Sequence, residues 1–598
     1  MCMQPEEYYK QRIDFLQISL AKLLSKKSTL GWSRFSVIIL VAAAIYFLLP
    51  FGWPYAVLSS IILLSVFTKL VFTDIDNNKA IQHTQLLIEI NQDEIKALAG
   101  QYLHFDNGAD HIPHDHLYSN DLDLFGKASL YQYLNRSTSA VGRTTVAKWL
   151  LDAADEPVIL KRQIAAKELH GKTEWRQSLQ AFGKEKKIEH STYQRLQEWM
   201  QEPNSFINNK VWRAMQLLVP VIMLTVVALN IFDLLSDPAR NILLIASAIL
   251  AFFISKKVVP IHDKVSKITE ELSVLSDSIY LIENTPFSSP LLTELQAFYK
   301  HENFTASGEM KKLKGIVQRM DWRLNPVVFI PLAILFQWDL VQVIALEKWK
   351  RRNHTNIIQW FEALGNFEAI SSFATLHFNH PDWCFPELKK EHFFIEGKEI
   401  GHPLINKIKR VNNYIDIEDK GIIMLVTGSN MAGKSTYLRS IGVNVVLAMA
   451  GAPVCAQRFA ISHVQVITSM RIADNLEENT STFYAELKKL KTVIEKVNNK
   501  EKVFVLLDEI LRGTNSLDRH TGAVALTKQL IRQQAAGIIA THDVELAKLK
   551  DDYPANIYNY HFDVQVTNGE LYFDYKLKDG ICTSLNASIL MKKIGIEL

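Results

Sequence analysis

Two pairs of long apolar stretches interrupt a chain of mixed hydrophobic and polar texture. The first pair covers residues 35–68 and contains no charged side chain. As one helix it would be about 51 Å long, which exceeds the roughly 30 Å hydrocarbon core of a bilayer. Pro50, Gly52 and Pro54 lie in its middle and divide it into two helices. The second pair covers 214–232 and 241–255. The pattern predicts four transmembrane helices arranged as two hairpins.

Positive charge flanks these hairpins on one side only. Lysine and arginine precede the first hairpin or flank the second at Lys22, Lys26, Lys27, Arg34, Arg213, Lys256 and Lys257. The turns at 51–54 and 233–240 hold almost none. Because cytoplasmic flanks carry the excess of lysine and arginine, both hairpins are expected to begin and end in the cytoplasm. We therefore expect a multi-pass protein of the inner (cytoplasmic) membrane with both termini in the cytoplasm.

A fifth apolar stretch at 325–346 differs from the other four. It contains Asp339 in its middle and prolines at 326 and 331. A fifth crossing would also place the C-terminal part of the chain on the far side of the membrane. We interpret this stretch as a buried helix of a soluble core, with a membrane location as the alternative.

The remaining chain changes texture near residue 390. Segments 81–210 and 260–389 show helical periodicity with short polar breaks, whereas later apolar runs such as "GIIMLVTG", "KVFVLLDE" and "AAGIIATHD" alternate with helical stretches. Such runs are typical of a parallel sheet covered on both faces. The predicted fold is multidomain, with a C-terminal α/β domain, an all-α core and the two hairpins. Its divisions are 1–80, 81–210, 211–259, 260–389 and 390–598.

Charge and cysteine content restrict the function only slightly. The formal charge is +3, from 66 basic and 63 acidic residues, so no bulk electrostatic argument indicates nucleic acid. The cysteines, at positions 2, 384, 455 and 582, show neither disulfide nor zinc spacing, which suits a reducing compartment.

A glycine-rich loop follows the strand predicted near 422–427. Its sequence fits G-x-x-x-x-G-K-[ST] and comprises Gly428, Ser429, Asn430, Met431, Ala432, Gly433, Lys434 and Ser435, followed by Thr436. In this context, backbone N–H groups and the N-terminus of the next helix attract phosphate. Lys434 is expected to reach the terminal phosphates and Ser435 to ligate Mg²⁺. The loop predicts a nucleotide site.

Two further predicted strands end in chemically active side chains. Asp508 and Glu509 follow "VFVLL", where burial of two carboxylates is costly without a role. We assign Asp508 to Mg²⁺, directly or through water, and Glu509 to the attacking water. His542 ends "GIIATH" and is positioned to sense the terminal phosphate. Alone, it would be an ordinary strand-end histidine.

The segment before these carboxylates predicts an amphipathic helix. Apolar residues recur at helical spacing at Phe483, Leu487, Leu490, Ile494 and Val497, and the helix is expected to begin near Ser481 and Thr482. Its N-terminus either faces a phosphate or is a simple N-cap.

The segments "TGSNMAGKST", "STFYAE", "LLDEILRGTNSLD" and "ATHDVEL", in this order and at these intervals, resemble the ATPase domain of the MutS mismatch-repair family. The likeness extends to "GHPLI" at 401–405 and "GICTSLNASILMKKIGI" at 580–596, and to residues 129–150, which resemble the start of the family's helical lever core. It implies an ATPase that uses ATP and Mg²⁺. It also implies a homodimer in which Ser481 and Thr482 complete the ATP site of the partner chain.

The chain departs from this family in several ways. Ser429 and Ala432 stand where the family usually has proline and glycine. No mismatch-reading domain is visible, and the second hairpin falls where the family places its DNA clamp. We expect a membrane-anchored ATPase that acts on DNA without sequence specificity and without direct mismatch reading. The alternative is a membrane mechanochemical ATPase that acts on a protein or lipid partner and binds no DNA.

Two polar clusters fall outside these motifs. Ligand-type side chains gather at His104, Asp106, Asp110, His111, His114, Asp115 and His116, without the spacing of a structural metal site. We interpret them as a solvated loop, with a metal site as the alternative. A basic group at Lys348, Lys350, Arg351 and Arg352 is interpreted as a solvated face, with contact to phosphate as the alternative.

Overall fold

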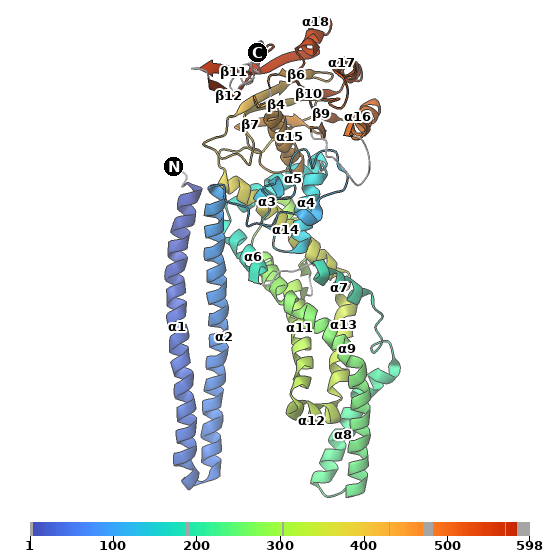
Figure 1. The fold of residues 1–598 in the computed structure, drawn as a ribbon. Helices are drawn as coiled ribbons and strands as arrows, with labels where there is room; N and C mark the ends of the chain where they lie inside the picture. Colours follow the sequence, from blue (N-terminus) through green and yellow to red (C-terminus); the bar gives the residue numbers. More distant parts are fainter. Residues whose placement is uncertain are drawn as a thin grey trace.

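A computed structural model describes residues 4–185, 190–301, 304–429, 431–470, 482–567 and 570–582. The α/β domain lies at one end of the molecule, and two helical hairpins extend side by side but apart to the other end (Figure 1). Helices of the core connect the two ends. The part described is therefore an elongated, multidomain protein with many helices and mixed α/β sheets.

The first hairpin consists of two very long helices, α1 (Pro5–Leu48) and α2 (Trp53–Leu98). A short 3₁₀ turn, Leu49–Phe51, and Gly52 with φ 127° reverse the chain between them. The two helices pack along their length, and Arg34 on α1 pairs with Asp74 on α2 at 3.2 Å. This ion pair lies beside the start of the charge-free stretch, so it joins the helices just outside their apolar halves.

The core is built from helices on both sides of the second hairpin. Those before it are α3 (Leu130–Leu134), α4 (Ala140–Leu151), α5 (Glu156–His170), α6 (Thr173–Glu185) and α7 (His190–Gln201). Those after it are α10 (Pro290–Ala297), α11 (Ala306–Met320), α12 (Pro326–Phe336), α13 (Trp338–Asn353) and α14 (Asn356–Asn379). Helix α14 is almost wholly buried and contacts α4 and α5, so it forms the centre of the core.

The second hairpin comprises α8 (Lys210–Ile231) and α9 (Asp237–Glu283). Helix α9 continues without a break through Pro260 into the core, where it packs on α11 and α6. The division predicted at 259/260 therefore falls inside one helix, and that at 80/81 falls inside α2. Each hairpin shares a continuous helix with the core.

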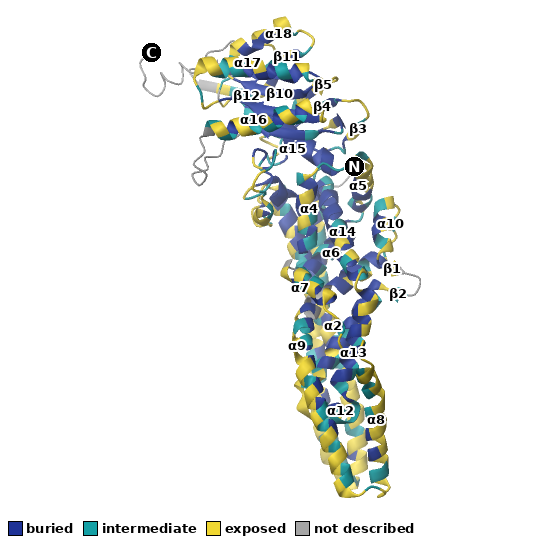
Figure 2. Cartoon of the chain, turned by 90° about the vertical axis from the view of Figure 1, so that its right-hand side faces the viewer, coloured by how far each residue is buried: buried dark blue, intermediate teal, exposed yellow. Residues whose placement is uncertain are grey.

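Four described helices are long and apolar enough to cross a membrane, namely α1, α2, α8 and the first part of α9. In α1 and α2 only 6% of the most apolar stretch is buried within the chain. Many apolar side chains of α1 and α2 are therefore exposed. Figure 2 shows exposed residues (yellow) along α8 and α9 in the lower part of the molecule.

The prediction of one buried helix over 325–346 is wrong for its first half. Gln337 adopts φ 50° and breaks the segment into α12 and α13, which meet at 79°. Helix α13 is buried as predicted, but α12 leaves Val327 83% and Ile330 55% exposed. Because Gln337 ends α12 at this point, α12 lies outside the buried core.

The α/β domain contains two sheets. The larger has the order β12-β11-β6-β10-β9-β8, and all its neighbours are parallel except β11 and β12. Its strands are β6 (Ile423–Thr427), β8 (Gln465–Ser469), β9 (Val503–Asp508), β10 (Ala536–Thr541), β11 (Ile557–Thr567) and β12 (Glu570–Asp579). The smaller has the order β3-β7-β4-β5, from β3 (Glu387–Lys389), β4 (Ile395–Ile400), β5 (Asn413–Ile417) and β7 (Arg458–Ser462).

Helices cover both faces of the larger sheet. They are α15 (Lys434–Ala450), α16 (Thr482–Asn498), α17 (Ser516–Arg532) and α18 (Leu549–Asp552). Strands β6, β9 and β10 are buried along their whole length, as the continuous apolar runs predicted. A two-stranded ribbon, β1 (Lys300–His301) with β2 (Phe304–Thr305), lies apart in the helical core.

Candidate functional site

Three central strands bring the predicted site residues to one edge of the sheet. Strand β10 pairs in parallel with β6 and β9, and the registers place Thr541 opposite Thr427 and Ala540 opposite Asp508. The carboxyl ends of these strands therefore meet at the same edge. The glycine-rich loop after β6, the two carboxylates after β9 and His542 after β10 all leave the sheet there, at the position where open α/β sheets hold ligands.

The glycine-rich loop is held close to the neighbouring strand β11. Gly428 has φ 151°, and a Cβ atom there would lie 2.9 Å from the carbonyl oxygen of Phe562. Gly433 has φ 111° and directly precedes α15. Only glycine fits both positions without strain. The loop therefore delivers its backbone to the N-terminus of α15, where N–H groups without helical partners face a ligand.

Lys434 is buried beneath this loop. Its ammonium group donates to the carbonyl oxygens of Gly428 at 2.7 Å and Ser429 at 3.0 Å. Burial lowers the pKa of Lys434, and the carboxylates of Glu509 and Asp508 oppose that shift. The ammonium group is thus placed inside the loop, held by two of its carbonyl oxygens.

Ser435 and Asp508 form a buried pair of oxygen ligands. The Ser435 hydroxyl donates to Oδ2 of Asp508 at 2.5 Å, whereas Oδ1 of Asp508 is buried and has no hydrogen-bond partner among the described residues. Burial raises the pKa of Asp508, against the lowering effect of the Ser435 hydrogen bond and of Arg512. A buried carboxylate with a free oxygen beside a hydroxyl fits Mg²⁺, which prefers oxygen ligands.

Glu509 adopts an unusual backbone conformation at the end of β9. Its φ is 50°, and its N–H donates to the carbonyl oxygen of Ala540 at 2.9 Å. Its carboxylate lies 3.3 Å from Nε of Arg512 and 3.8 Å from Nδ1 of His542. Left-handed backbone at a non-glycine residue is costly, and such strain gathers at functional sites. The conformation turns the carboxylate into the site.

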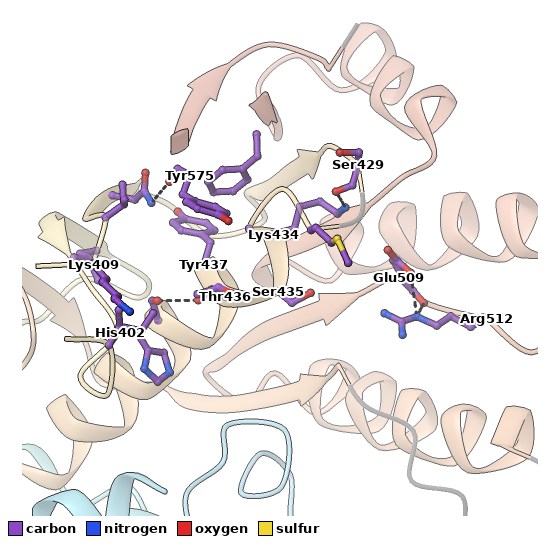
Figure 3. Close-up of a pocket in the computed structure, with 18 residues that line it drawn as sticks. His402, Lys409, Ser429, Lys434, Ser435, Thr436, Tyr437, Glu509, Arg512 and Tyr575 are labelled. Atoms are coloured by element: carbon purple, nitrogen blue, oxygen red, sulfur yellow. Dashed lines mark hydrogen bonds and ion pairs between the residues drawn. The ribbon is translucent and has the colours of Figure 1, made fainter. Parts of the chain in front are cut away.

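A cavity of about 560 Å³ opens over these groups. Figure 3 shows Lys434, Ser435, Thr436 and Glu509 facing it, together with side chains that the sequence patterns did not identify. The additional residues come from several elements. His402 and Lys409 lie between β4 and β5, Tyr437 on α15, Arg512 after β9 and Tyr575 on β12. His402 lies in "GHPLI" and Tyr437 directly follows the glycine-rich motif, so both were adjacent to recognised signals. Burial lowers the pKa of His402 to about 4, which keeps its ring neutral.

Glu486 is a further residue that the sequence analysis missed. It lies on α16 in "STFYAE", and its carboxylate accepts hydrogen bonds from the backbone N–H groups of Leu511 and Arg512. These residues lie two and three positions after Glu509, and Leu511 also has positive φ, 61°. Glu486 therefore holds the segment that positions Glu509.

The structure describes only some of the other predicted site residues. Met431 is 82% exposed, while Ala432 is buried behind the loop. Thr482 begins α16, as the periodicity predicted, but Asn430, Ser481 and the side chain of Thr482 lie outside the described residues. His542 contacts Glu509 but does not line the cavity, so its predicted role stays a prediction.

The two remaining clusters contact the protein itself. Within the described residues, no group of three or more histidine, cysteine, aspartate or glutamate side chains is arranged to hold a metal ion. His104 pairs with Asp93 at 3.4 Å, and His116 bonds to the carbonyl oxygen of Leu151 at 3.1 Å. In the basic group, Lys350 is buried and donates to the carbonyl oxygen of Glu202 at 2.7 Å, so this residue does not belong to a solvated face.

Fold and site together define a multidomain protein whose C-terminal α/β domain gathers a glycine-rich loop, a lysine and two carboxylates around one cavity. Residues 424–592 match the family described as MutS domain V, so this part of the chain is similar to that family. Similar proteins include DNA mismatch repair protein MSH4 of Arabidopsis thaliana, 34% identical over 198 residues, and DNA mismatch repair protein MutS of Chlorobium phaeovibrioides, 34% identical over 215 residues. MutS protein homolog 4 of Homo sapiens is 33% identical over 209 residues.

The likeness to these relatives is confined to one part of the chain. The three alignments cover 32%, 35% and 33% of this chain, and 24%, 24% and 22% of the relatives. The chain thus spans about a quarter of the length of the relatives it matches. The weaker resemblance of residues 129–150 to the family's lever core stays a prediction.

Proposed function

We propose that the C-terminal domain binds ATP with Mg²⁺ and hydrolyses it. The observation that carries this proposal is the buried Ser435–Asp508 pair with its free Oδ1, next to Lys434 and Glu509 in one cavity. Ser435 and Asp508 would hold Mg²⁺, which when bound neutralises phosphate charge. The match of residues 424–592 to MutS domain V supports the same activity.

Each side chain at the site has a separate proposed role in hydrolysis. Lys434 exchanges its contacts with the Gly428 and Ser429 carbonyl oxygens for the terminal phosphates. Glu509 orients the attacking water, and Arg512 holds its carboxylate in place. Such positioning and electrostatic stabilisation carry most of phosphoryl transfer. Glu486 acts as a positioning residue through the backbone of Leu511 and Arg512.

We further propose that the four long apolar helices anchor this ATPase in the inner membrane. Exposed apolar side chains over α1, α2, α8 and α9 favour lipid as their surroundings, because a soluble protein rarely exposes apolar patches of this extent. Two chains would pair through their ATPase domains, with Ser481 of each completing the ATP site of the other. Opening and closing of that dimer would move the hairpins through the continuous helices α2 and α9.

DNA is the proposed partner, bound without sequence specificity. The relatives are named as DNA mismatch repair proteins, which supports DNA as the substrate of this chain. In the sequence, the second hairpin falls where the resembled family places its DNA clamp, which favours binding that ignores mismatches.

The test is the DNA affinity of detergent-solubilised protein, measured with matched and mismatched duplexes over a series of salt concentrations, alongside ATP hydrolysis. We expect ATP hydrolysis, a steep loss of affinity with salt, and equal affinity for both duplexes. Hydrolysis without any DNA binding would favour a protein or lipid partner instead. Absence of hydrolysis under all conditions would contradict the ATPase proposal.

A further inference from the structure

The helix α12 exposes an apolar surface beside the second hairpin. It has eleven residues, of which only Ala333 is buried, and it contacts both α8 and α9. Its outward side chains continue the exposed apolar surface of the hairpin, where Phe252 and Ile249 on α9 are 67% and 53% exposed. Figure 1 shows α12 lying across the lower end of α11 and α13, at the side of the hairpin.

Two hydrogen bonds fix the position of α12 relative to the apolar part of α9. The Ser247 hydroxyl donates to the carbonyl oxygen of Ile334, and the Gln337 side chain donates to the Ser247 hydroxyl at 2.9 Å. Ser247 lies in the middle of the apolar stretch 241–255. The C-terminal end of α12 is therefore level with residues that the proposed function places inside the bilayer.

A buried polar cluster lies next to the contact between α12 and α9, on the side proposed to face the cytoplasm. Asp339 accepts hydrogen bonds from Arg323 at 3.0 Å and from Ser255 at 2.5 Å. The side chains of Asp339 and Arg323 are 3% and 10% exposed. The rings of Trp322 and Trp338 stack beside the cluster at 5.1 Å. Paired charges and tryptophan are typical of the level where the hydrocarbon core meets the headgroups.

From these contacts we infer that α12 is embedded in the cytoplasmic leaflet as a helix that does not cross the membrane. At about 1.5 Å per residue it is too short to span the core, and its length suits an interfacial or re-entrant segment. Because the chain enters and leaves on the same side, the ATPase domain stays in the cytoplasm. The occupant of its outer surface is lipid, because that surface is continuous with the lipid-facing surface of α8 and α9.

This inference rests on the proposed membrane anchoring and adds a third point of contact with the bilayer. The tip of the α11–α13 pair, and not only the hairpins, would then move in lipid when the core moves. Helix α13 leads to the central helix α14 after a short break at residues 354–355. A displacement of α14 would therefore be transmitted to the leaflet through α12.

The test uses the full-length protein in liposomes, with its four native cysteines replaced and a spin label on one introduced cysteine. Collision rates with oxygen, which is enriched in lipid, and with a water-soluble nickel chelate report the surroundings of the label. The label is placed at Val327 on α12, at Phe252 on α9 as a lipid control, or at Lys312 on α11 as a water control. Lys312 is a suitable control because its side chain is 60% exposed on the surface of α11.

We expect the label at Val327 to collide more often with oxygen than with the nickel chelate, as at Phe252. Its depth should lie nearer to the headgroups than to the centre of the bilayer. A label at Val327 that favours the nickel chelate while that at Phe252 favours oxygen would overturn the inference and leave the anchor intact. Nickel preference at both positions would contradict the membrane anchor itself. A label at Val327 that is shielded from both reagents and couples magnetically to a second label would instead indicate a contact between chains, and would also overturn the inference.

Discussion

Asp508 and Glu509 are neighbours in the chain but have different surroundings. Asp508 ends β9, is buried, and keeps one oxygen without a hydrogen-bond partner among the described residues. Glu509 turns out of the strand with positive φ and faces Arg512 and the cavity. One backbone change at the end of a strand thus separates a carboxylate suited to Mg²⁺ from one suited to orienting water.

Replacement of Glu509 by Gln is expected to preserve ATP binding and to lower the rate of hydrolysis by at least about a hundredfold, because water positioning is lost. Binding of a fluorescent ATP analogue and release of phosphate measure the two effects separately. Glu545→Gln is the matched control, since Glu545 is exposed and pairs with Lys548 on the surface. Hydrolysis by Glu509→Gln at the wild-type rate would show that another group orients the water.

Replacement of Asp508 by Asn is expected to raise the melting temperature of the nucleotide-free protein. The folded state raises the pKa of Asp508 above its ordinary value of 3.8, so ionisation destabilises the fold as pH rises above that value. The gain over wild type should therefore be present at pH 7 and disappear near pH 3. Mg²⁺ with ATP should stabilise wild type much more than Asp508→Asn. Equal stabilisation of both proteins would remove Asp508 from the Mg²⁺ site.

At the scale of elements, two long helices bind the hairpins to the core. The α2 helix reaches from the apolar turn to Glu94, which contacts Asn379 at the C-terminal end of α14. There, Glu94 accepts hydrogen bonds from Arg136 and, at 2.7 Å, from Asn379, while Tyr9 of α1 donates to the same Asn379 at 2.7 Å. The first hairpin is therefore fastened to the core by a buried polar network rather than by a flexible linker.

Replacement of Arg136 by Ala should destabilise the protein by about 3–5 kcal/mol, because it leaves the Glu94 carboxylate buried without its charge partner. Both side chains are at most 5% exposed. Thermal unfolding in detergent measures the effect. Glu89→Ala, which breaks the surface pair of Glu89 with Lys184, should cost less than about 1 kcal/mol. A small effect of Arg136→Ala would show that the hairpin is not held by this network.

The sequence predicted the elements of this fold better than their connections. Continuous apolar runs located β6, β9 and β10, and local motifs located the loop and carboxylates that β10 brings together. By contrast, the break between α12 and α13 depends on the left-handed conformation of Gln337, which no glycine or proline at that position signals. Glu486 was missed because its contacts are with backbone groups 25 and 26 residues away.

At the scale of the whole molecule, the account requires both hairpins to enter the same membrane from the cytoplasm. A cysteine introduced at Ser236, in the turn between α8 and α9, is expected to react with an impermeant thiol reagent from outside intact cells. One at Asn499, just after α16, is expected to react only after lysis. The four native cysteines are replaced first. Labelling with the opposite pattern would contradict the topology of four crossings.

The central claim is that ATP-driven closure of two ATPase domains moves the second hairpin. Its most direct test is the distance between the two chains of a dimer, measured between spin labels at Arg213 or at Lys257 in Glu509→Gln protein reconstituted in membranes. Both positions are exposed, at the end of the hairpin that joins the core. Labels at Asn499 report closure of the ATPase domains in the same samples.

We predict that addition of ATP and Mg²⁺ changes the distance at Asn499 and, together with it, the distances at Arg213 and Lys257. The continuous helix α9 is the physical reason, because a rigid helix carries a displacement of the core to the hairpin. A change at Asn499 with fixed distances at Arg213 and Lys257 would contradict the claim, and the hairpins would then be passive anchors.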